Sequence, residues 1–225
     1  SEFLYNIESF LENTSYGTHT NKNSNITVVC THSGGQPFLG HFTYAISEYL
    51  QANYISVEKC SMANFKPEYK LDIKKQKSYL DQSKSENHFV NDFKNDLLET
   101  VKENSLVIYF ACGAKGKGDF HLLNGGSVGN EEFISENSLF ESVEKLNNFK
   151  TELFNSYKNI NPETVINTHQ HYGNDDKEEF QWMIKREKNA NILCIYVTAK
   201  LLFSKANVYY PTVQCIGDAI KSKLT

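Results

Sequence analysis

Apolar residues along this chain alternate between short continuous runs and runs with helical spacing. The strongest continuous run, 106–110, is rich in β-branched and aromatic residues, which is typical of a strand buried on both faces of a sheet. Four similar runs are also predicted to be strands: 25–30, 54–57, 164–168 and 191–198. Stretches with apolar residues three or four apart are predicted to be helices: 42–51, 89–103, 138–157, 178–186 and 213–224. This alternation indicates an α/β protein with a mostly parallel central sheet flanked by helices.

We expect one folded domain preceded by a short arm. Residues 1–24 combine a short amphipathic piece with polar Asn, Thr and Ser residues, so they are predicted to form an N-terminal arm. Residues 25–225 are predicted to form a single α/β domain, because a segment of this length can bury one full core and no linker divides it. The chain begins Ser-Glu-Phe without an initiator Met, so we expect the natural protein to extend before Ser1.

Composition argues against several classes of protein. The net charge is −4, so no overall basic surface would recruit nucleic acid or anionic lipid. No apolar run approaches the roughly 20 residues needed to cross a bilayer. The five cysteines are odd in number and lack the CxxC or His/Cys spacing of zinc sites, which is typical of free thiols in a reducing compartment. We therefore expect a cytoplasmic protein that binds neither nucleic acid nor membranes and needs no cofactor.

Candidate chemistry gathers where the predicted strands end. His32 follows the first strand, Cys112 ends the strongest strand, and His169 follows the fourth. These residues would meet in one crevice if the first, third and fourth strands were neighbours in a parallel sheet. A thiol within hydrogen-bond reach of an imidazole is the minimum nucleophile pair, and either histidine could be the base. For a single cysteine the plain alternative, a buried structural thiol, is favoured. Further residues expected to line this crevice are Cys30, Gly113, Asn167 and Gln170.

Two other motifs are weaker. The turn at 34–40 lies between the first strand and the first helix, as phosphate-binding loops do. It matches neither GxGxxG nor GxxxxGK[ST], and Pro37 removes one backbone donor, so a plain turn is favoured over a Rossmann-like nucleotide or small-ligand site. His169 and His171 are two residues apart and would point to opposite sides of a strand, so no metal site is predicted.

The order of these segments resembles that of caspase-like peptidases, including metacaspases. The string NSLVIYFACGAKGKGDFHLL is similar to the family's buried strand that ends at its catalytic His and leads to a Gly-rich hairpin, and PETVINTHQHYGNDD is similar to the strand that carries its catalytic Cys. The opening NITVVC with FLGHFTYAISEYL, and the later NILCIYVTAK with YYPTVQCIGDAI, match the family's first strand and helix and the start of its small subunit. The resemblance implies a caspase-like three-layer sandwich over most of residues 25–220.

The departures from this family fall on its functional positions. Cys112 or Gly113 stands where the catalytic His is expected, and residues 167–169 read Asn-Thr-His where the family has Gln-Ala-Cys. The resemblance therefore implies a proteolytically inactive domain that regulates a protein partner, such as an active caspase-like protease. The alternative is an active cysteine peptidase in which Cys112 attacks and His169 or His32 is the base. In this alternative the Cys and His have exchanged places relative to the family. The exchange is disfavoured, because the backbone donors that stabilise the oxyanion would still be arranged around a nucleophile on the strand at 164–168.

Overall fold

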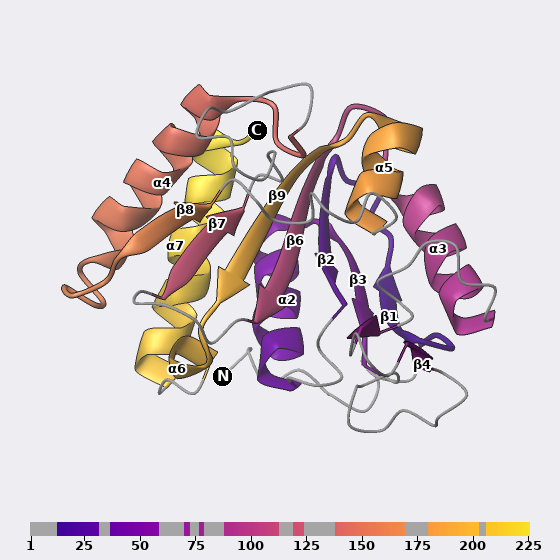
Figure 1. Ribbon diagram of the computed structural model, residues 1–225. Coiled ribbons are helices and arrows are strands. Elements are labelled where there is room, and N and C mark those ends of the chain that lie inside the picture. The colour runs from indigo at the N-terminus through magenta and orange to yellow at the C-terminus, as the bar shows by residue number, and fades with distance from the viewer. Residues whose placement is uncertain are drawn as a thin grey trace.

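The computed structural model describes residues 13–31, 37–58, 70–72, 77–78, 88–112, 119–123, 138–169, 180–202 and 206–225. Its centre is a seven-stranded sheet (Figure 1). From one edge to the other the strands are β1 (Gly17–Thr20), β3 (Asn53–Val57), β2 (Ile26–Cys30), β6 (Leu106–Cys112), β9 (Asn191–Val197), β7 (Phe120–Leu123) and β8 (Ile166–His169). A separate antiparallel pair is formed by β4 (Lys70–Asp72) and β5 (Lys77–Ser78).

The sheet is mixed, which corrects the expectation of a mostly parallel one. Strands β3, β2, β6 and β9 run parallel to one another. Strand β1 pairs antiparallel with β3, and β7 pairs antiparallel with β9. Because β8 is parallel to β7, it also runs against the four central strands. The α/β class itself is confirmed.

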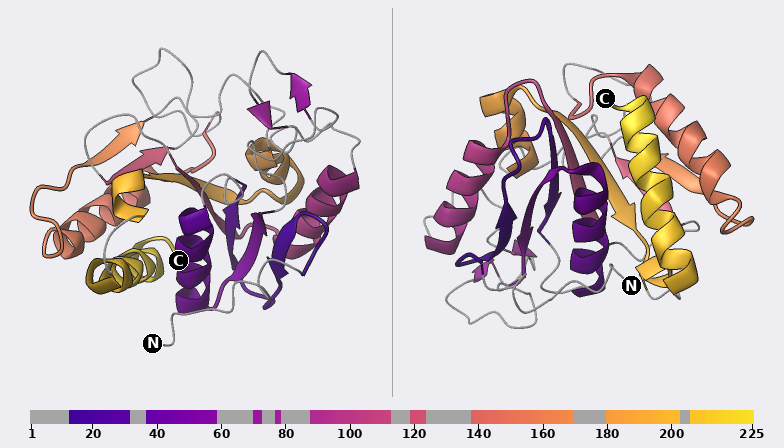
Figure 2. Two further views of the ribbon diagram at one scale, coloured as in Figure 1. Left: turned by 90° about the horizontal axis from the view of Figure 1, so that it is seen from below. Right: turned by 180° about the vertical axis from the view of Figure 1, so that it is seen from behind.

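Helices lie on both sides of this sheet (Figures 1 and 2). One side carries α2 (Pro37–Leu50), α4 (Val143–Tyr157), α6 (Ala199–Leu202) and α7 (Ala206–Lys223). The other side carries α3 (His88–Thr100) and α5 (Phe180–Lys188). We refer to these as the α2/α7 face and the α3/α5 face of the sheet. None of the described helices is long and apolar enough to cross a membrane.

Burial on both faces explains the unbroken apolar run of β6. Successive side chains of a strand point to opposite faces. Ile108 and Phe110 are fully buried among the residues of the α2/α7 face, while Val107 and Tyr109 pack among those of the α3/α5 face. Each position therefore needs an apolar side chain, as the sequence of this strand predicts.

Part of the predicted N-terminal arm belongs to the sheet. Gly17–Thr20 form β1, with Gly17 opposite Val57 and Thr20 opposite Tyr54. The preceding residue, Tyr16, is fully buried and donates a hydrogen bond of 2.7 Å to Asp96 of α3. The polar composition that suggested an arm is instead that of an edge strand, which pairs with the sheet along one side only.

Candidate functional site

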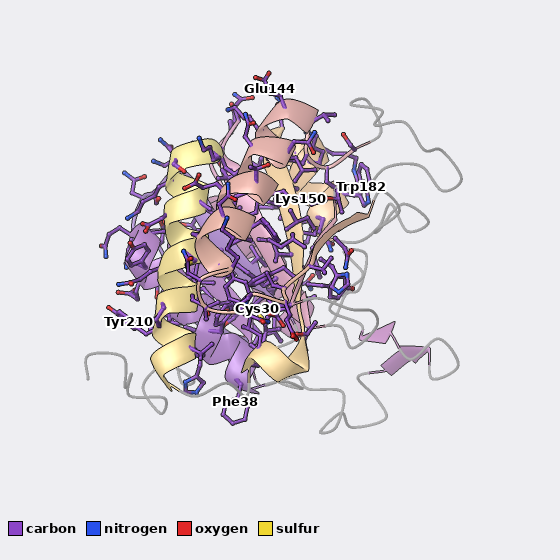
Figure 3. All side chains as sticks on the ribbon, turned by 90° about the vertical axis from the view of Figure 1, so that its left-hand side faces the viewer. Cys30, Phe38, Glu144, Lys150, Trp182 and Tyr210 are labelled. Atoms are coloured by element: carbon purple, nitrogen blue, oxygen red, sulfur yellow. The ribbon has the colours of Figure 1, made fainter. Side chains whose placement is uncertain are left out.

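Two of the predicted strand ends do lie side by side. β2 pairs with β6, and Cys30 lies opposite Phe110, so Cys112 is two residues further along the same face. Cys30 is fully buried in the layer between the sheet and the helices of the α2/α7 face (Figure 3). Cys112 is half-buried at the carboxyl end of β6. His32, Gly113 and Gln170 lie outside the described residues, so their place in a crevice stays a prediction.

The third predicted strand end is elsewhere, and this corrects the expected pairing of Cys112 with His169. β9 and β7 separate β8 from β6, which at about 4.8 Å for each strand spacing amounts to about 14 Å across the sheet. β8 also runs in the opposite direction, so its first residue, Ile166, is level with Cys112. His169 is level with Tyr109, about 10 Å lower along the strands. A nucleophile–base contact between Cys112 and His169 is therefore ruled out by the backbone, and Asn167 does not join Cys112 either.

The described surroundings of the Cys112 thiol do not activate it. Burial raises its pKa, because the partly apolar surroundings disfavour the thiolate. Reactive cysteines have lowered pKa values instead, produced by a nearby cation or a helix N-terminus. At neutral pH Cys112 is therefore a protonated thiol and a poor nucleophile.

We expect Cys112 to be alkylated slowly at pH 7. Iodoacetamide reacts with the thiolate, whose fraction is small at neutral pH and rises about tenfold for each pH unit until the pH passes the raised pKa. The measurement is the alkylation rate of Cys112, followed by mass spectrometry of its peptide between pH 7 and 10, with denatured protein as the reference. A rate at pH 7 above that of the denatured protein would contradict this assignment.

A row of polar side chains crosses the other face of the sheet. Tyr196 of β9 lies directly opposite His121 of β7, and His121 lies directly opposite Asn167 of β8. On its other side Tyr196 lies opposite Ala111 of β6, which contributes only a methyl group. Thr31 continues the row beyond β2, since it follows Cys30 in register and accepts a hydrogen bond of 3.3 Å from the Tyr109 hydroxyl. We call Thr31, Ala111, Tyr196, His121 and Asn167 the polar row.

The polar row interrupts an otherwise apolar face. Cys194 and Tyr109 precede it on β9 and β6 and belong to the apolar cluster under α3 and α5. Within the row, His121 is only 6% exposed, and Tyr196 and Asn167 are half-buried. Tyr196 and His121 were not predicted as site residues from the sequence. A single polar residue within an apolar run does not indicate a functional site until its cross-strand neighbours are known. Asn167 was expected beside Cys112 and belongs to this row instead.

A buried carboxylate lies next to the row at the start of β7. Asp119 is 5% exposed, and its Oδ2 atom accepts hydrogen bonds from the Tyr157 hydroxyl at 2.8 Å and the Asn161 amide at 2.7 Å. The Thr164 hydroxyl donates to the same oxygen at 3.4 Å. Buried carboxylates are stable only with such donors. Asp119 therefore joins the end of α4 to the edge of the sheet.

Thr198 contributes a buried hydroxyl at the same edge. It follows β9 directly, and its backbone N–H donates to the Asp119 carbonyl oxygen at 3.1 Å. Its Oγ1 atom is shielded from solvent and makes no hydrogen bond with any residue that the structure describes. A buried hydroxyl without a partner costs about 1–3 kcal/mol.

The described residues do not fit a zinc site. Within the described part of the chain, no three His, Cys, Asp or Glu side chains come close enough to hold a metal ion. Among the described residues at the carboxyl ends of β6 and β3, the side chains that could donate to a metal are Cys112 and Glu58. The Cys112 thiol is held in its protonated form, and the Glu58 carboxylate accepts hydrogen bonds from Ser56 and Thr18.

Several solved structures are similar to this chain at low sequence identity. The apo cell shape determinant protein Csd4 from Helicobacter pylori is 12% identical, with a TM-score of 0.50 over 88% of this chain and 50% of its own. A metallo-carboxypeptidase from Burkholderia cenocepacia is 9% identical, with a TM-score of 0.48 over 88% of this chain and 56% of its own. The chain thus spans about half the length of both. The apo N-acetylmuramyl-L-alanine amidase Ami1 from Mycobacterium abscessus is 9% identical, with a TM-score of 0.41 over 89% of this chain and 98% of its own.

No family model matches the sequence, and no curated protein sequence matches it either. The likeness to Csd4 concerns the fold alone, since identity is 12%.

The likeness of the fold to Csd4 and the order of the strands overturn the resemblance to caspase-like peptidases. The caspase assignment also needs β6 and β8 to be neighbours, because these strands would carry the catalytic His and Cys, and the sheet keeps them apart. The inactive caspase-like regulator and the cysteine peptidase based on Cys112 were therefore both wrong. The Rossmann-like alternative was wrong as well, because that fold has a parallel sheet. The expected protein partner and the cytoplasmic location stay predictions.

Proposed function

We propose that this chain binds a neutral, amide-containing ligand, such as a peptide, on the polar row. The observation that carries the proposal is the register that places Tyr196, His121 and Asn167 directly opposite one another on three adjacent strands. Directly opposed residues of neighbouring strands have β-carbons about 4.5–5.5 Å apart, so the three polar groups can act on one small ligand. Ligand sites in α/β proteins commonly lie toward the carboxyl ends of the central strands, where this row is found.

The chemistry of the row favours an uncharged ligand. None of its members is Asp, Glu, Lys or Arg, whereas a charged ligand buried here would need an opposite charge. The Asn167 amide both donates and accepts hydrogen bonds, as do the hydroxyl groups of Tyr196 and Thr31 and the imidazole of His121. A peptide group offers the matching N–H and C=O. A neutral amide is thus the ligand class that this row suits best.

Hydrolysis of the bound amide is the second candidate function. It is favoured by His121, which places a group able to transfer protons in the middle of the row. The test is incubation of the protein with a mixture of capped peptides, with and without added zinc chloride, and mass spectrometry of the products. Cleavage by the wild type that is lost in His121→Gln would support this candidate. Absence of cleavage under both conditions, or equal cleavage by the variant, would contradict it.

Binding is tested with N-acetyl-dialanine amide as the probe. We expect millimolar probe to shift the NMR signals of the His121 imidazole and the Asn167 side-chain amide in isotope-labelled protein. Asn167→Leu removes a donor and an acceptor while keeping the side-chain volume, so we expect it to weaken probe binding about tenfold, equivalent to about 1.4 kcal/mol. Circular dichroism would confirm that the variant is folded.

Thr168→Val is the matched control for this variant. Thr168 is the next residue of β8, exposed and directed to the opposite face, so its replacement should leave probe affinity unchanged. Equal loss of affinity in both variants would show that the edge strand, not the polar row, had been disturbed. Absence of shifts at His121 and Asn167, or equal shifts with sodium acetate, would contradict the proposed ligand class.

A further inference from the structure

The β8 edge of the sheet is associated with exposed apolar side chains. β8 pairs with β7 on one side, and no described strand lies on its other side. Among the described residues, five large apolar side chains are exposed. Three of these belong to this part of the fold: Val143 and Phe154 of α4, and Val165, which directly precedes β8. Exposed apolar residues beside an edge strand are typical of a surface that binds another chain.

The opposite edge of the sheet is already occupied. The Asn13 side chain donates a hydrogen bond of 2.8 Å to the His19 carbonyl of β1 and accepts one of 3.2 Å from the His19 backbone N–H. Edge strands are also commonly protected by charged residues or proline. Residues 165–168 read Val-Ile-Asn-Thr and include neither. β8 is therefore the edge that better suits pairing with a further strand.

The exposed apolar side chains of α4 are directed past the β8 edge. The Ser156 side chain is hydrogen-bonded to Cys215 of α7 and so marks the flank of α4 that faces α7. At about 100° per residue, Phe154 lies about 160° and Val143 about 140° around the helix from Ser156. Since α4 is the outermost helix on its side of the sheet, the flank away from α7 is directed beyond β8 (Figure 2). We call it the outer flank of α4.

The outer flank of α4 carries opposite charges at its two ends. Glu144 lies in the first turn of the helix and Lys158 directly follows its last residue, and both are exposed. The exposed residues of this flank between them, Asn147, Thr151 and Phe154, are uncharged. Two such helices packed antiparallel bring Glu144 of each copy toward Lys158 of the other, whereas parallel packing would bring like charges together. The flank is thus complementary in charge to a second copy of itself.

The strand and the helix can share one two-fold axis. The ring of Tyr157 packs on that of Phe120 with 5.0 Å between their centroids, and Phe120 lies opposite Ile166, so the end of α4 is level with the start of β8. β8 runs back along α4 (Figure 1). Thr168 lies about 6.6 Å beyond Ile166, which corresponds to about four residues of helix. An axis through the β8 edge at Thr168 therefore passes within about two residues of the middle of α4.

We propose that two copies of this chain bind edge to edge about this axis, with β8 antiparallel to β8 of the partner copy and α4 antiparallel to its α4. The seven-stranded sheet then continues from one copy into the other. Backbone hydrogen bonds join the two β8 strands, and the partner helix covers Phe154. Because the axis is two-fold, the contact between Glu144 and Lys158 occurs twice. The side chains of the polar row lie on the other face of the sheet and take no part.

Sedimentation equilibrium of the 225-residue chain tests this association. A four-residue strand and one helix flank form a small interface, so we expect the apparent mass to rise from that of one chain toward that of two between about 5 and 500 µM. Phe154→Lys places a charge inside the interface and should raise the dissociation constant at least about tenfold. Phe154 is exposed in the single chain, so the variant should fold, which circular dichroism would verify.

A charge exchange tests the antiparallel arrangement. Glu144→Lys and Lys158→Glu each place like charges opposite one another, so each should raise the dissociation constant about tenfold at low salt. The double variant restores opposite charges and should bind within about twofold of the wild type. Lys145→Glu is the matched control, because Lys145 lies only about 20° around the helix from Ser156, on the flank that faces α7. It should leave the dissociation constant unchanged.

Hydrogen–deuterium exchange reports on the strand pairing. We expect the backbone amides of β8 to exchange more slowly at 500 µM than at 5 µM protein, as they would if about two-thirds or more of the chains were paired. A single-chain mass at 500 µM would overturn the inference, as would a dimer that Phe154→Lys does not weaken. A double variant weaker than both single variants would overturn the antiparallel arrangement. Unchanged exchange in β8 of a dimeric sample would overturn the strand pairing.

Discussion

Replacing Asp119 with alanine is expected to lower the free energy of unfolding by about 3–5 kcal/mol, because the Tyr157, Asn161 and Thr164 donors lose their shared acceptor at about 1–3 kcal/mol each. The two shorter bonds, at 2.8 and 2.7 Å, should account for most of the loss. The backbone contact from Thr198 to the Asp119 carbonyl does not depend on the side chain and should survive. Equilibrium unfolding in urea, followed by circular dichroism, measures the change.

Two control variants separate this network from a general effect of substitution. Tyr157→Phe removes one donor and leaves Asp119 with the other two, so it should cost about 1–2 kcal/mol. Glu163→Ala changes an exposed carboxylate close by in sequence and should cost less than about 0.5 kcal/mol. A decrease of less than about 1 kcal/mol in the free energy of unfolding for Asp119→Ala would contradict this prediction. It would mean that water replaces the carboxylate and that this part of the sheet is more accessible to solvent than in the structure.

The protein is expected to lose stability steeply above about pH 10. Burial raises the pKa of Tyr16, Tyr54 and Tyr157 far above the value of 10.0 for a free tyrosine, and hydrogen bonds to carboxylates act in the same direction on Tyr16 and Tyr157. Above pH 10 the unfolded chain releases these protons while the folded chain retains them. The unfolded state then binds fewer protons, so the free energy of unfolding is constant below pH 10 and falls as the pH rises further. Three such groups give a slope of about 4 kcal/mol per pH unit.

Urea unfolding at a series of pH values from 8 to 11 measures this slope. Absorbance at 295 nm reports phenolate formation in the same samples. Tyr16→Phe removes one of the three groups, so the slope above pH 10 should decrease by about a third. Full phenolate absorbance from a protein that is still folded at pH 11 would show that these tyrosines reach solvent.

Local sequence was sufficient for most of the secondary structure. The apolar run at 106–110 became β6, and the helical spacing at 42–51 became part of α2. The last helix begins earlier than predicted, at Ala206, because Pro211 lies inside it without ending it. β1 was missed, because an edge strand with polar residues resembles a loop when its pairing with β3 is unknown.

The arrangement of the candidate site could be predicted from the sequence only in part. The expected crevice required β2 and β6 to be neighbours, and they are, so the strand ends that carry Cys30 and Cys112 lie side by side. The insertion of β7 between β9 and β8 was not expected. It moves β8 to the edge and reverses its direction, which separates His169 from Cys112 and brings Asn167 to His121. The polar row exists only because of that insertion.

The sequence by itself determined most of the helices and the strands of the buried core, because the spacing of apolar residues follows the faces that a helix or strand buries. It could not determine the order and direction of the strands, since these depend on contacts between residues far apart in the chain. The tertiary structure alone decided that Tyr196, His121 and Asn167 form one row. It also decided that the Thr198 hydroxyl lies buried beside the start of β7. The physical reason is that hydrogen-bonded register, which no local pattern encodes, sets which side chains can act together.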